Sequence, residues 1–265
     1  MSLITLLTDF GLRDGYVGVL KGVIAQIAAD VPTVDLTHDI APQAVVAARF
    51  VLMNSYRYFP TGTVHCIVVD PGVGTDRRAI ALEAEVAGQR QFFVAPDNGV
   101  LDGILGRWGS PVGRVVTLTH SEYWRVQQPS HTFHGRDIFA PVAAHLATGT
   151  ELDRLGEAVS ADSLVRLPKA DAIATPQGFH GTVQYIDRFG NAVTTLPAQD
   201  VAAKPWRLSV KERLVLQYAS YGQAQPGDLL ALIGSHGWVE IAVNQGSAAA
   251  RLGLQIGDRV ALTWL

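Results

Sequence analysis

Short apolar runs alternate with amphipathic stretches through residues 1–167. Runs typical of buried strands lie at 3–7, 33–37, 63–69, 79–85 and 91–95. Apolar residues at helical spacing lie at 16–29, 42–56, 99–108 and 140–147. Strands separated by helices favour βαβ units, so residues 1–167 are predicted to form an α/β domain around a mainly parallel sheet.

The pattern changes near residue 168. Residues 168–178 contain two prolines and show no clear period, which is typical of a linker. Residues 179–265 consist mostly of strand-like runs and turns, with hairpin-like connections at 187–191 and 234–237. Evenly spaced strands and turns predict a small antiparallel barrel or sandwich for this second domain.

The composition is that of a globular protein, since 48% of the 265 residues are hydrophobic and 17% are charged. A formal net charge of −3 provides no basic field for a nucleic-acid backbone, so we expect no nucleic-acid partner. The single cysteine, Cys66, lies in an apolar run and is expected to be buried. We see no disulfide framework, signal peptide or apolar run of ~18 residues, so a cytoplasmic protein without a membrane segment is predicted.

Two carboxylates directly follow predicted strands. Ligands of open α/β sheets bind outside the carboxyl ends of the strands, where Asp9 and Asp70 fall. Asp9 can accept hydrogen bonds from a ribose diol, or it can serve as a loop or helix-cap residue. After Asp70 the chain turns and brings back Arg77 and Arg78, which indicates either a site or an ordinary surface ion pair.

Residues 130–137 combine two histidines, an arginine and an aspartate before an apolar helix. Such density of titratable groups favours a functional site. The spacing does not match a zinc site, because there is no H-E-x-x-H and one cysteine excludes thiolate sets. No dinucleotide fingerprint, P-loop or nucleophile elbow is present either. We therefore expect no metal and no cofactor.

Eight short segments follow one another along the chain: Thr8-Asp-Phe-Gly11, Val34-Asp-Leu-Thr-His38, Gly62-Thr-Val-His65, Val69-Asp-Pro-Gly-Val-Gly-Thr-Asp-Arg-Arg78, Ala95-Pro-Asp-Asn-Gly99, Thr132-Phe-His-Gly-Arg-Asp137, Phe189-Gly-Asn191 and Gly234-Ser-His-Gly237. In this order they resemble the S-adenosylmethionine (SAM) hydroxide adenosyltransferases, or adenosine-forming SAM hydrolases, which are related to fluorinases and chlorinases. The resemblance implies a Rossmann-like N-terminal domain, a β-barrel C-terminal domain, and a homotrimer with its site between neighbouring subunits. It also implies that SAM is the substrate and that adenosine and L-methionine are the products.

The resemblance further implies a catalytic set of Asp70, Arg77 and His134. Arg77 and His134 would stabilise a hydroxide-like water by directed hydrogen bonds, and either Asp70 or His134 would take its proton. Halogenases of this group lack the set and carry a serine where this chain has Gly135. The intact set therefore favours water over halide as the nucleophile.

Substrate-binding roles follow from the same resemblance. Asp9 matches the residue that holds the ribose hydroxyls, and Asn191 matches the one that contacts the adenine edge. Asp14 and Ser235 match residues near the amino and carboxyl groups of methionine. His236 replaces a fluorinase arginine near the substrate carboxylate.

Two aromatic residues have two interpretations each. Phe133 and Phe189 can pack on the base, or they can belong to the cores of their domains. Gln43 stands where the fluorinases carry a tryptophan near the ribose, so that side of the pocket is expected to be looser.

Three alternative functions are compatible with the sequence. The chain could transfer the adenosyl group to a halide, against which Gly135 speaks. It could bind SAM or a nucleoside without turnover. It could also be a metal-dependent hydrolase that uses Asp9, Asp70 and His134.

Overall fold

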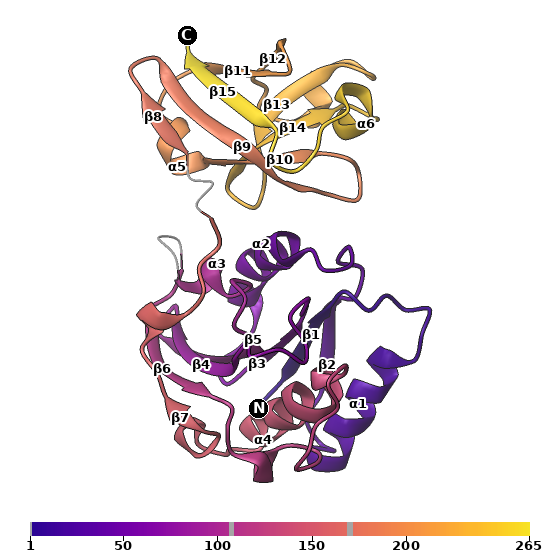
Figure 1. Ribbon diagram of the computed structural model, residues 1–265. Helices are drawn as coiled ribbons and strands as arrows, with labels where there is room; N and C mark the ends of the chain where they lie inside the picture. The colour runs from indigo at the N-terminus through magenta and orange to yellow at the C-terminus, as the bar shows by residue number, and fades with distance from the viewer. Residues whose placement is uncertain (1, 106–108, 169–171) are drawn as a thin grey trace. The chain divides into compact units, whose positions relative to one another are not determined.

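The computed structural model describes residues 2–105, 109–168 and 172–265, and the chain divides into two compact units, residues 1–167 and 168–265 (Figure 1). Each unit has its own sheet and its own hydrophobic core. No helix among the described residues is long and apolar enough to cross a membrane.

The N-terminal unit is built on a seven-stranded mixed sheet of order β2-β1-β3-β5-β4-β6-β7. Strands β2, β1, β3 and β5 run parallel, and β4, β6 and β7 continue the sheet in antiparallel pairings. The strands are β1 (Ile4–Thr8), β2 (Thr33–Thr37), β3 (Val64–Val68), β4 (Ala79–Val86), β5 (Gln89–Pro96), β6 (Val112–Thr117) and β7 (Glu157–Ala158).

Among the residues that the structure describes, four α-helices accompany this sheet. They are α1 (Tyr16–Ile27), α2 (Val45–Ser55), α3 (Asp102–Leu105) and α4 (Ala140–Ala147). A π-helix over Gly135–Phe139 runs directly into α4. Short 3-10 helices lie at Tyr56–Tyr58, Ser121–Tyr123, Leu152–Arg154 and Ala161–Ser163.

Alternation along the strands gives the sheet two buried faces. Leu6 and Cys66 pack in one core cluster with Leu20 of α1 and with residues of α4. Their neighbour His65 points to the opposite face, where its ring lies 6.5 Å from that of Tyr56. Burial raises the pKa of the Cys66 thiol to about 12, which makes the thiol an inert core group as expected.

His65 is a buried titratable group on that second face. Its Nδ1 lies 2.8 Å from the Thr5 hydroxyl and its Nε2 lies 3.1 Å from Oε1 of Gln91. Burial lowers the pKa of His65 to about 4, although the hydrogen bond with Gln91 acts in the opposite direction. The ring is therefore neutral in the folded protein at neutral pH.

We expect this histidine to make the protein less stable in mild acid. The unfolded chain takes up the proton near pH ~6.5, so the free energy of unfolding falls as the pH drops from there to about 4. One such group accounts for about 2 kcal/mol between roughly pH 7 and 5. Urea midpoints across this range should fall less steeply in His65→Gln than in the wild type. The remaining histidines are present in both proteins, so the difference between the two slopes of urea midpoint against pH is due to His65. Equal slopes would contradict the assignment of His65 as the group that destabilises the protein in mild acid.

The C-terminal unit is an antiparallel, barrel-like sheet of order β12-β11-β15-β9-β10-β14-β13, with β8 paired to β9. A bridge between Gln217 and Ala231 connects the β12 end to β13, so the sheet nearly closes. The strands are β8 (Ile173–Thr175), β9 (Gly178–Ile186), β10 (Ala192–Pro197), β11 (Trp206–Val210), β12 (Arg213–Leu216), β13 (Leu229–Ile233), β14 (Trp238–Val243) and β15 (Arg259–Trp264). The helices are α5 (Ala198–Val201), α6 (Ala248–Leu252) and a 3-10 turn over Tyr221–Gln223.

The predicted fold class, α/β with an antiparallel barrel-like second part, is confirmed. The N-terminal sheet contains more antiparallel pairing than expected, because Ala87 and Gly88 have positive φ and join β4 to β5 by a two-residue turn. The pattern also does not predict β6, and β8 lies within the stretch predicted as a linker.

Two predicted helices are shorter than expected. The helix predicted over 42–56 begins only at Val45, since Gln43 has a φ of 65° that no α-helix accommodates. Of the helix predicted over 99–108, the structure gives Asp102–Leu105, and residues 106–108 lie outside the described residues.

Candidate active site

The two strand-end carboxylates lie at the same edge of the N-terminal sheet. Strands β1 and β3 are neighbours and parallel, and Thr8 is paired with Val68. The chain then leaves both strands at the same level, and Asp9 and Asp70 follow within two residues of these positions. The edge is the one at which open α/β sheets bind ligands.

Asp70, Arg77 and His134 form one hydrogen-bonded cluster. Arg77 Nε donates to Asp70 Oδ1 at 3.1 Å, and Arg77 Nη2 donates to Asp70 Oδ2. The same Nη2 lies 3.1 Å from Nδ1 of His134. The side chains of Asp70 and Arg77 are 5% and 7% exposed, so their ion pair is not a surface pair screened by water.

A glycine allows the two segments of this cluster to touch. Gly74 has a φ of 78°, and a Cβ at this position would lie 2.3 Å from the carbonyl oxygen of His131. No other residue fits so close to another backbone in that conformation. The loop that carries Asp70 and Arg77 therefore packs directly on the segment that leads to His134.

The protonation state of His134 follows from its partner. A guanidinium N–H can only donate, so the Nδ1 that faces Arg77 must be unprotonated. Burial, followed by the charge of Arg77, lowers the pKa of His134, which keeps the ring neutral at neutral pH. The proton of the neutral ring is then on Nε2, where it can be donated to a bound water or ligand.

Asp137 holds the loop around His134. Its carboxylate is fully buried and accepts from Nε of Arg125 and Nε of Arg136, both at 2.8 Å, and from the Ser130 backbone N–H at 2.9 Å. Burial by itself would raise the pKa of Asp137, but these hydrogen bonds outweigh it and hold the pKa well below its usual range. The sequence pattern places Asp137 in the cluster of titratable groups at 130–137 but indicates no role for it.

The neighbouring arginine has different partners. Arg78 donates to Oδ2 of Asp97 through Nε at 2.9 Å and through Nη2 at 2.5 Å. Its Nη2 also donates to the Ser163 carbonyl at 2.6 Å. Arg78 thus ties two loops of the N-terminal unit together, whereas Arg77 faces Asp70 and His134.

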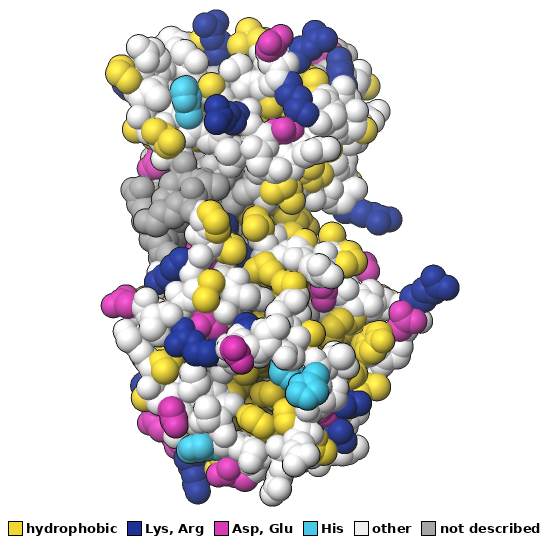
Figure 2. Space-filling view, in the orientation of Figure 1, with side chains coloured by type: hydrophobic (Ala, Val, Ile, Leu, Met, Phe, Trp, Pro, Cys, Tyr) yellow, Lys and Arg dark blue, Asp and Glu magenta, His cyan; other side chains and the backbone are white. Residues whose placement is uncertain are grey.

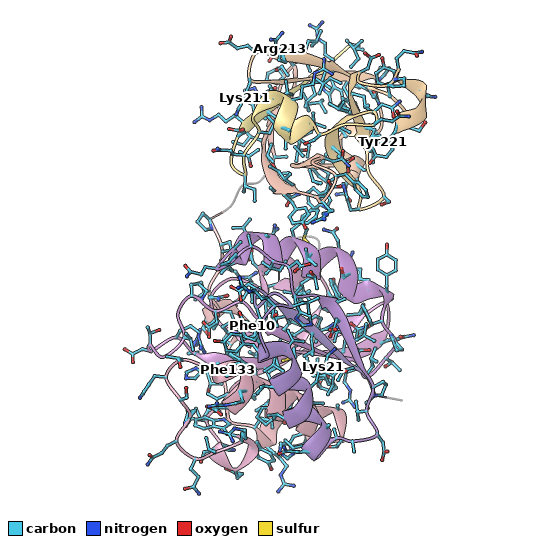
Figure 3. All side chains as sticks on the ribbon, turned by 90° about the vertical axis from the view of Figure 1, so that its right-hand side faces the viewer. Phe10, Lys21, Phe133, Lys211, Arg213 and Tyr221 are labelled. Carbon is cyan, nitrogen blue, oxygen red and sulfur yellow. The ribbon has the colours of Figure 1, made fainter. Side chains whose placement is uncertain are left out.

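Phe133 and Gly135 flank His134 in different ways. The Phe133 ring lies edge-on to those of Phe10 and Tyr16, at centroid distances of 5.8 and 5.2 Å. Figure 3 labels Phe10 and Phe133 in the N-terminal unit. A Cβ at Gly135 would lie 3.1 Å from Cγ1 of Val68, which is tighter than ordinary packing. A larger residue at position 135 would therefore require Val68 to move.

Asp9 is held by groups that the sequence does not reveal. Its Oδ2 accepts from the backbone N–H of Gln43 at 2.7 Å, and the left-handed conformation of Gln43 belongs to this contact. His38 fixes the loop, since its carbonyl accepts from Gly11 and its Nδ1 lies 2.8 Å from the Thr8 hydroxyl. Such contacts depend on tertiary structure, so the sequence gives no signal for them. In the structure they are accompanied by the positive φ of Gln43.

Asp14 and several other residues near this edge are exposed. Asp14 lies on the loop before α1, and Leu12 and Tyr16 beside it are 70% and 49% exposed. Figure 2 shows that apolar side chains reach the surface in several places on the face of the N-terminal unit turned toward the viewer. Leu12, three residues after Asp9, and Tyr16 thus add exposed apolar side chains to the loop that follows β1.

The predicted residues of the C-terminal unit lie on two hairpin turns. Phe189 is 75% exposed, so it does not belong to the core. Asn191 is buried and donates from its backbone N and from Nδ2 to the carboxylate of Asp187. Ser235 is exposed at the tip of the turn between β13 and β14, and His236 follows it.

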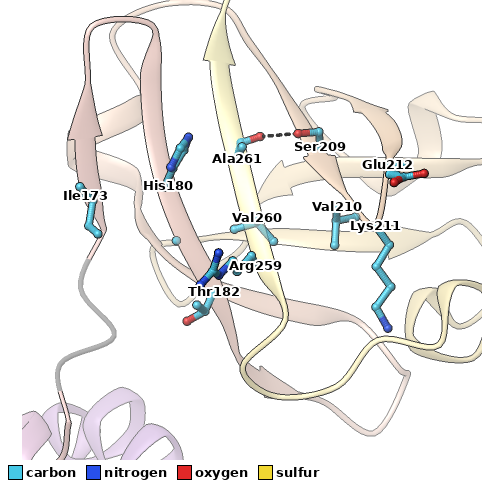
Figure 4. Close-up of a pocket in the computed structure, with 11 residues that line it drawn as sticks. Ile173, His180, Thr182, Ser209, Val210, Lys211, Glu212, Arg259, Val260 and Ala261 are labelled. Carbon is cyan, nitrogen blue, oxygen red and sulfur yellow. Dashed lines mark hydrogen bonds between the residues drawn. The ribbon is translucent and has the colours of Figure 1, made fainter.

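A hollow of about 700 Å³ lies on the outer side of β9, β11 and β15 (Figure 4). His180, Ser209, Lys211 and Arg259 line it, and none of the predicted site residues does. Lys211 is already paired with Asp258 at 3.0 Å. Within the described ranges, no group of three histidine, cysteine or acidic side chains is arranged to hold a metal ion.

Together, the fold and the site define a class: an α/β unit with a shielded carboxylate–guanidinium–imidazole cluster at its sheet edge, followed by a barrel-like unit. The N-terminal-domain profile of the SAM hydroxide adenosyltransferases matches residues 4–156, and the C-terminal-domain profile matches residues 181–261. The chain belongs to the SAM hydroxide adenosyltransferase family.

Several relatives support this assignment. The chain is 40% identical over 260 residues to the (R)-S-adenosyl-L-methionine hydrolase of Salinispora tropica, with 98% of this chain and 97% of the relative covered. It is 27% identical over 294 residues to a fluorinase of Actinopolyspora mzabensis, with 98% of this chain and 97% of the fluorinase covered. A crystal structure of an uncharacterized conserved protein from Thermotoga maritima matches with a TM-score of 0.89 and 36% identity over 98% of this chain and all of the other.

Proposed function

We propose that this protein hydrolyses SAM to adenosine and L-methionine. The observation that carries the proposal is the hydrogen-bonded set of Asp70, Arg77 and His134 at the ligand-binding edge of the sheet. Identity of 40% to relatives named as SAM hydrolases supports the same reaction. Substrate and products are small molecules, and we propose a cytoplasmic homotrimer with the site at the interface between subunits.

Attack by water at the ribose C5′ would form the new C–O bond as the C5′–S bond breaks. The sulfonium leaves as a neutral thioether, so no general acid is required. Water is a weak nucleophile. Hydrogen-bond donors that face the attacking water stabilise the hydroxide that develops from it, and this makes the attack easier. Arg77 and the Nε2–H of His134 supply such donors. Because Nε2 of His134 already carries a proton, we assign Asp70 as the group that accepts the proton of the water.

Substrate positioning is assigned to residues of both units. Asp9 would accept hydrogen bonds from the ribose hydroxyls, and Asp14 and Ser235 would bind the methionine end. Asn191 has Oδ1 to accept from the adenine amino group, since Nδ2 donates to Asp187. The exposed ring of Phe189 can stack on the base.

Incubation of the purified protein with SAM in ¹⁸O-labelled water tests the reaction. We expect adenosine with the label in its 5′-hydroxyl, and unlabelled methionine. Under the same conditions His134→Ala should form little product, because it removes one of the two donors.

Other outcomes would replace this proposal. A 5′-halogenated nucleoside formed with chloride or fluoride would indicate a halogenase, which the fluorinase relatives make the second candidate. Saturable SAM binding without product would indicate a binding protein. Loss of activity with EDTA, restored by a divalent metal, would indicate a metal-dependent hydrolase.

A further inference from the structure

A carboxylate is buried beside the Ser235 turn of the C-terminal unit. Glu240 lies in the middle of β14, a strand whose residues are all buried, and Glu240 itself is only 3% exposed. Its Oε1 accepts from the Tyr221 hydroxyl at 2.5 Å, and its Oε2 lies 3.0 Å from Nε2 of His236. Burial, followed by the hydrogen bond with Glu240, raises the pKa of Tyr221, so the hydroxyl keeps its proton and donates.

The partners of His236 define its tautomer. The backbone N–H of Trp238 lies 3.2 Å from Nδ1 and can only donate, so Nδ1 is unprotonated. The proton of the neutral ring is then on Nε2, which donates it to Glu240. Both ring nitrogens are thus used within the C-terminal unit.

The ring of His236 also packs on the turn. A Cβ at Gly234 would lie 2.5 Å from Cε1 and 2.6 Å from Nε2 of His236, so the ring occupies the space above this glycine. The turn is closed by hydrogen bonds from Gly234 N to the Trp238 carbonyl and from Gly237 N to the Gly234 carbonyl, both 2.9 Å. The orientation of the imidazole therefore contributes to the backbone conformation on either side of Ser235.

We propose that Glu240, assisted by Tyr221, is a positioning residue that holds His236 as its neutral Nε2–H tautomer and so fixes the turn that presents Ser235 to the methionine end of SAM. This inference rests on the proposed function, because it takes Ser235 to be a substrate contact. His236 then acts through the conformation of the turn, and its ring nitrogens do not bind the substrate carboxylate. The role concerns binding and leaves the chemistry at C5′ to the cluster around Arg77.

Steady-state kinetics of Glu240→Ala test the role in binding. We expect KM for SAM to rise about tenfold, since a hydrogen bond to a charged group is lost and the turn loosens, while kcat stays within about twofold. Glu240→Gln should stay close to the wild type, because its amide oxygen can accept from His236 while its amide nitrogen donates to Tyr221. Tyr221→Phe should raise KM by about threefold, because it removes the hydroxyl that donates to Glu240. The control is Tyr218→Phe, which removes another tyrosine hydroxyl of the same unit and should leave KM and kcat unchanged.

Histidine side-chain ¹⁵N NMR of the substrate-free protein tests the positioning independently of turnover. We expect the His236 signals of the wild type and of Glu240→Gln to show an acceptor Nδ1 and a protonated Nε2. In Glu240→Ala the two tautomers should average, and His236→Gln assigns the signals. If Glu240→Ala does not fold, the wild-type spectrum and Tyr221→Phe carry the test.

The outcomes separate this inference from the function on which it rests. Active wild-type protein together with unchanged KM and unchanged His236 signals in Glu240→Ala would overturn the positioning role and leave the hydrolase intact. The same role is overturned by a wild-type spectrum with a protonated Nδ1. No adenosine from the wild type would refute the proposed function, while the spectra would still show whether Glu240 controls the ring.

Discussion

Arg77→Ala is expected to lower kcat for adenosine formation by about 10²- to 10³-fold, the usual effect of removing one donor to a developing oxyanion. Arg77 contacts Asp70 and His134 at once, so its loss removes the donor and also releases the ring of His134. Arg77→Lys keeps the positive charge beside Asp70 but not the fork geometry, and we expect only partial recovery. Product formation is measured by chromatography under saturating SAM.

Arg78→Ala is the matched control for that experiment. Arg78 is the adjacent residue and also pairs with an aspartate, but this aspartate is Asp97 and not Asp70. This variant should unfold at a lower temperature and still turn over SAM while folded. If both variants lost activity to the same extent, the assignment of Arg77 as the catalytic arginine would be wrong.

Asp137→Ala is expected to lower the free energy of unfolding by about 3 kcal/mol. Removal of one partner from a buried ion pair costs roughly 3–5 kcal/mol, and the lower end applies because both arginines retain access to water. The side chains of Arg125 and Arg136 are 37% and 31% exposed. Urea unfolding at neutral pH measures the effect.

Acid provides the control for this prediction. The folded-state pKa of Asp137 is lowered, so its contribution is complete above the unfolded value near pH ~4 and is lost as the pH falls further. Asp137→Asn has no carboxylate to titrate, so it lacks this contribution at every pH. Its urea midpoint should therefore approach the wild-type midpoint below about pH 4. A neutral-pH midpoint of Asp137→Ala equal to that of the wild type would show that the carboxylate does not hold the loop.

Much of the architecture could be predicted because it depends on local patterns. The hairpin-like connection predicted at 234–237 matches the structure, where it joins β13 to β14, since a four-residue turn with two glycines separates two apolar runs. Carboxylates that follow buried parallel strands necessarily come to one edge of a sheet, which brought Asp9 and Asp70 together.

The remaining features depend on contacts that cross the chain. The two-residue turn at Ala87 and Gly88 reverses β5 relative to β4, and the predicted strands on either side give no sign of direction. Gln43 takes a positive φ beside the Asp9 carboxylate, a backbone conformation that glutamine does not favour. Glu240 offered a signal that could have been used: it is the one charged residue within the apolar strand Trp238–Val243.

The close approach at Gly74 has an evolutionary consequence. Because main chain meets main chain there, the spacing between the segments that carry Arg77 and His134 depends on the paths of two loops as well as on the side chains that hold them. A change of length or a bulkier residue in one loop would displace the other, so the two segments are expected to vary together among descendants of this sequence. Transplanting one of them into a relative without the other would carry over the residues of the site but not their spacing.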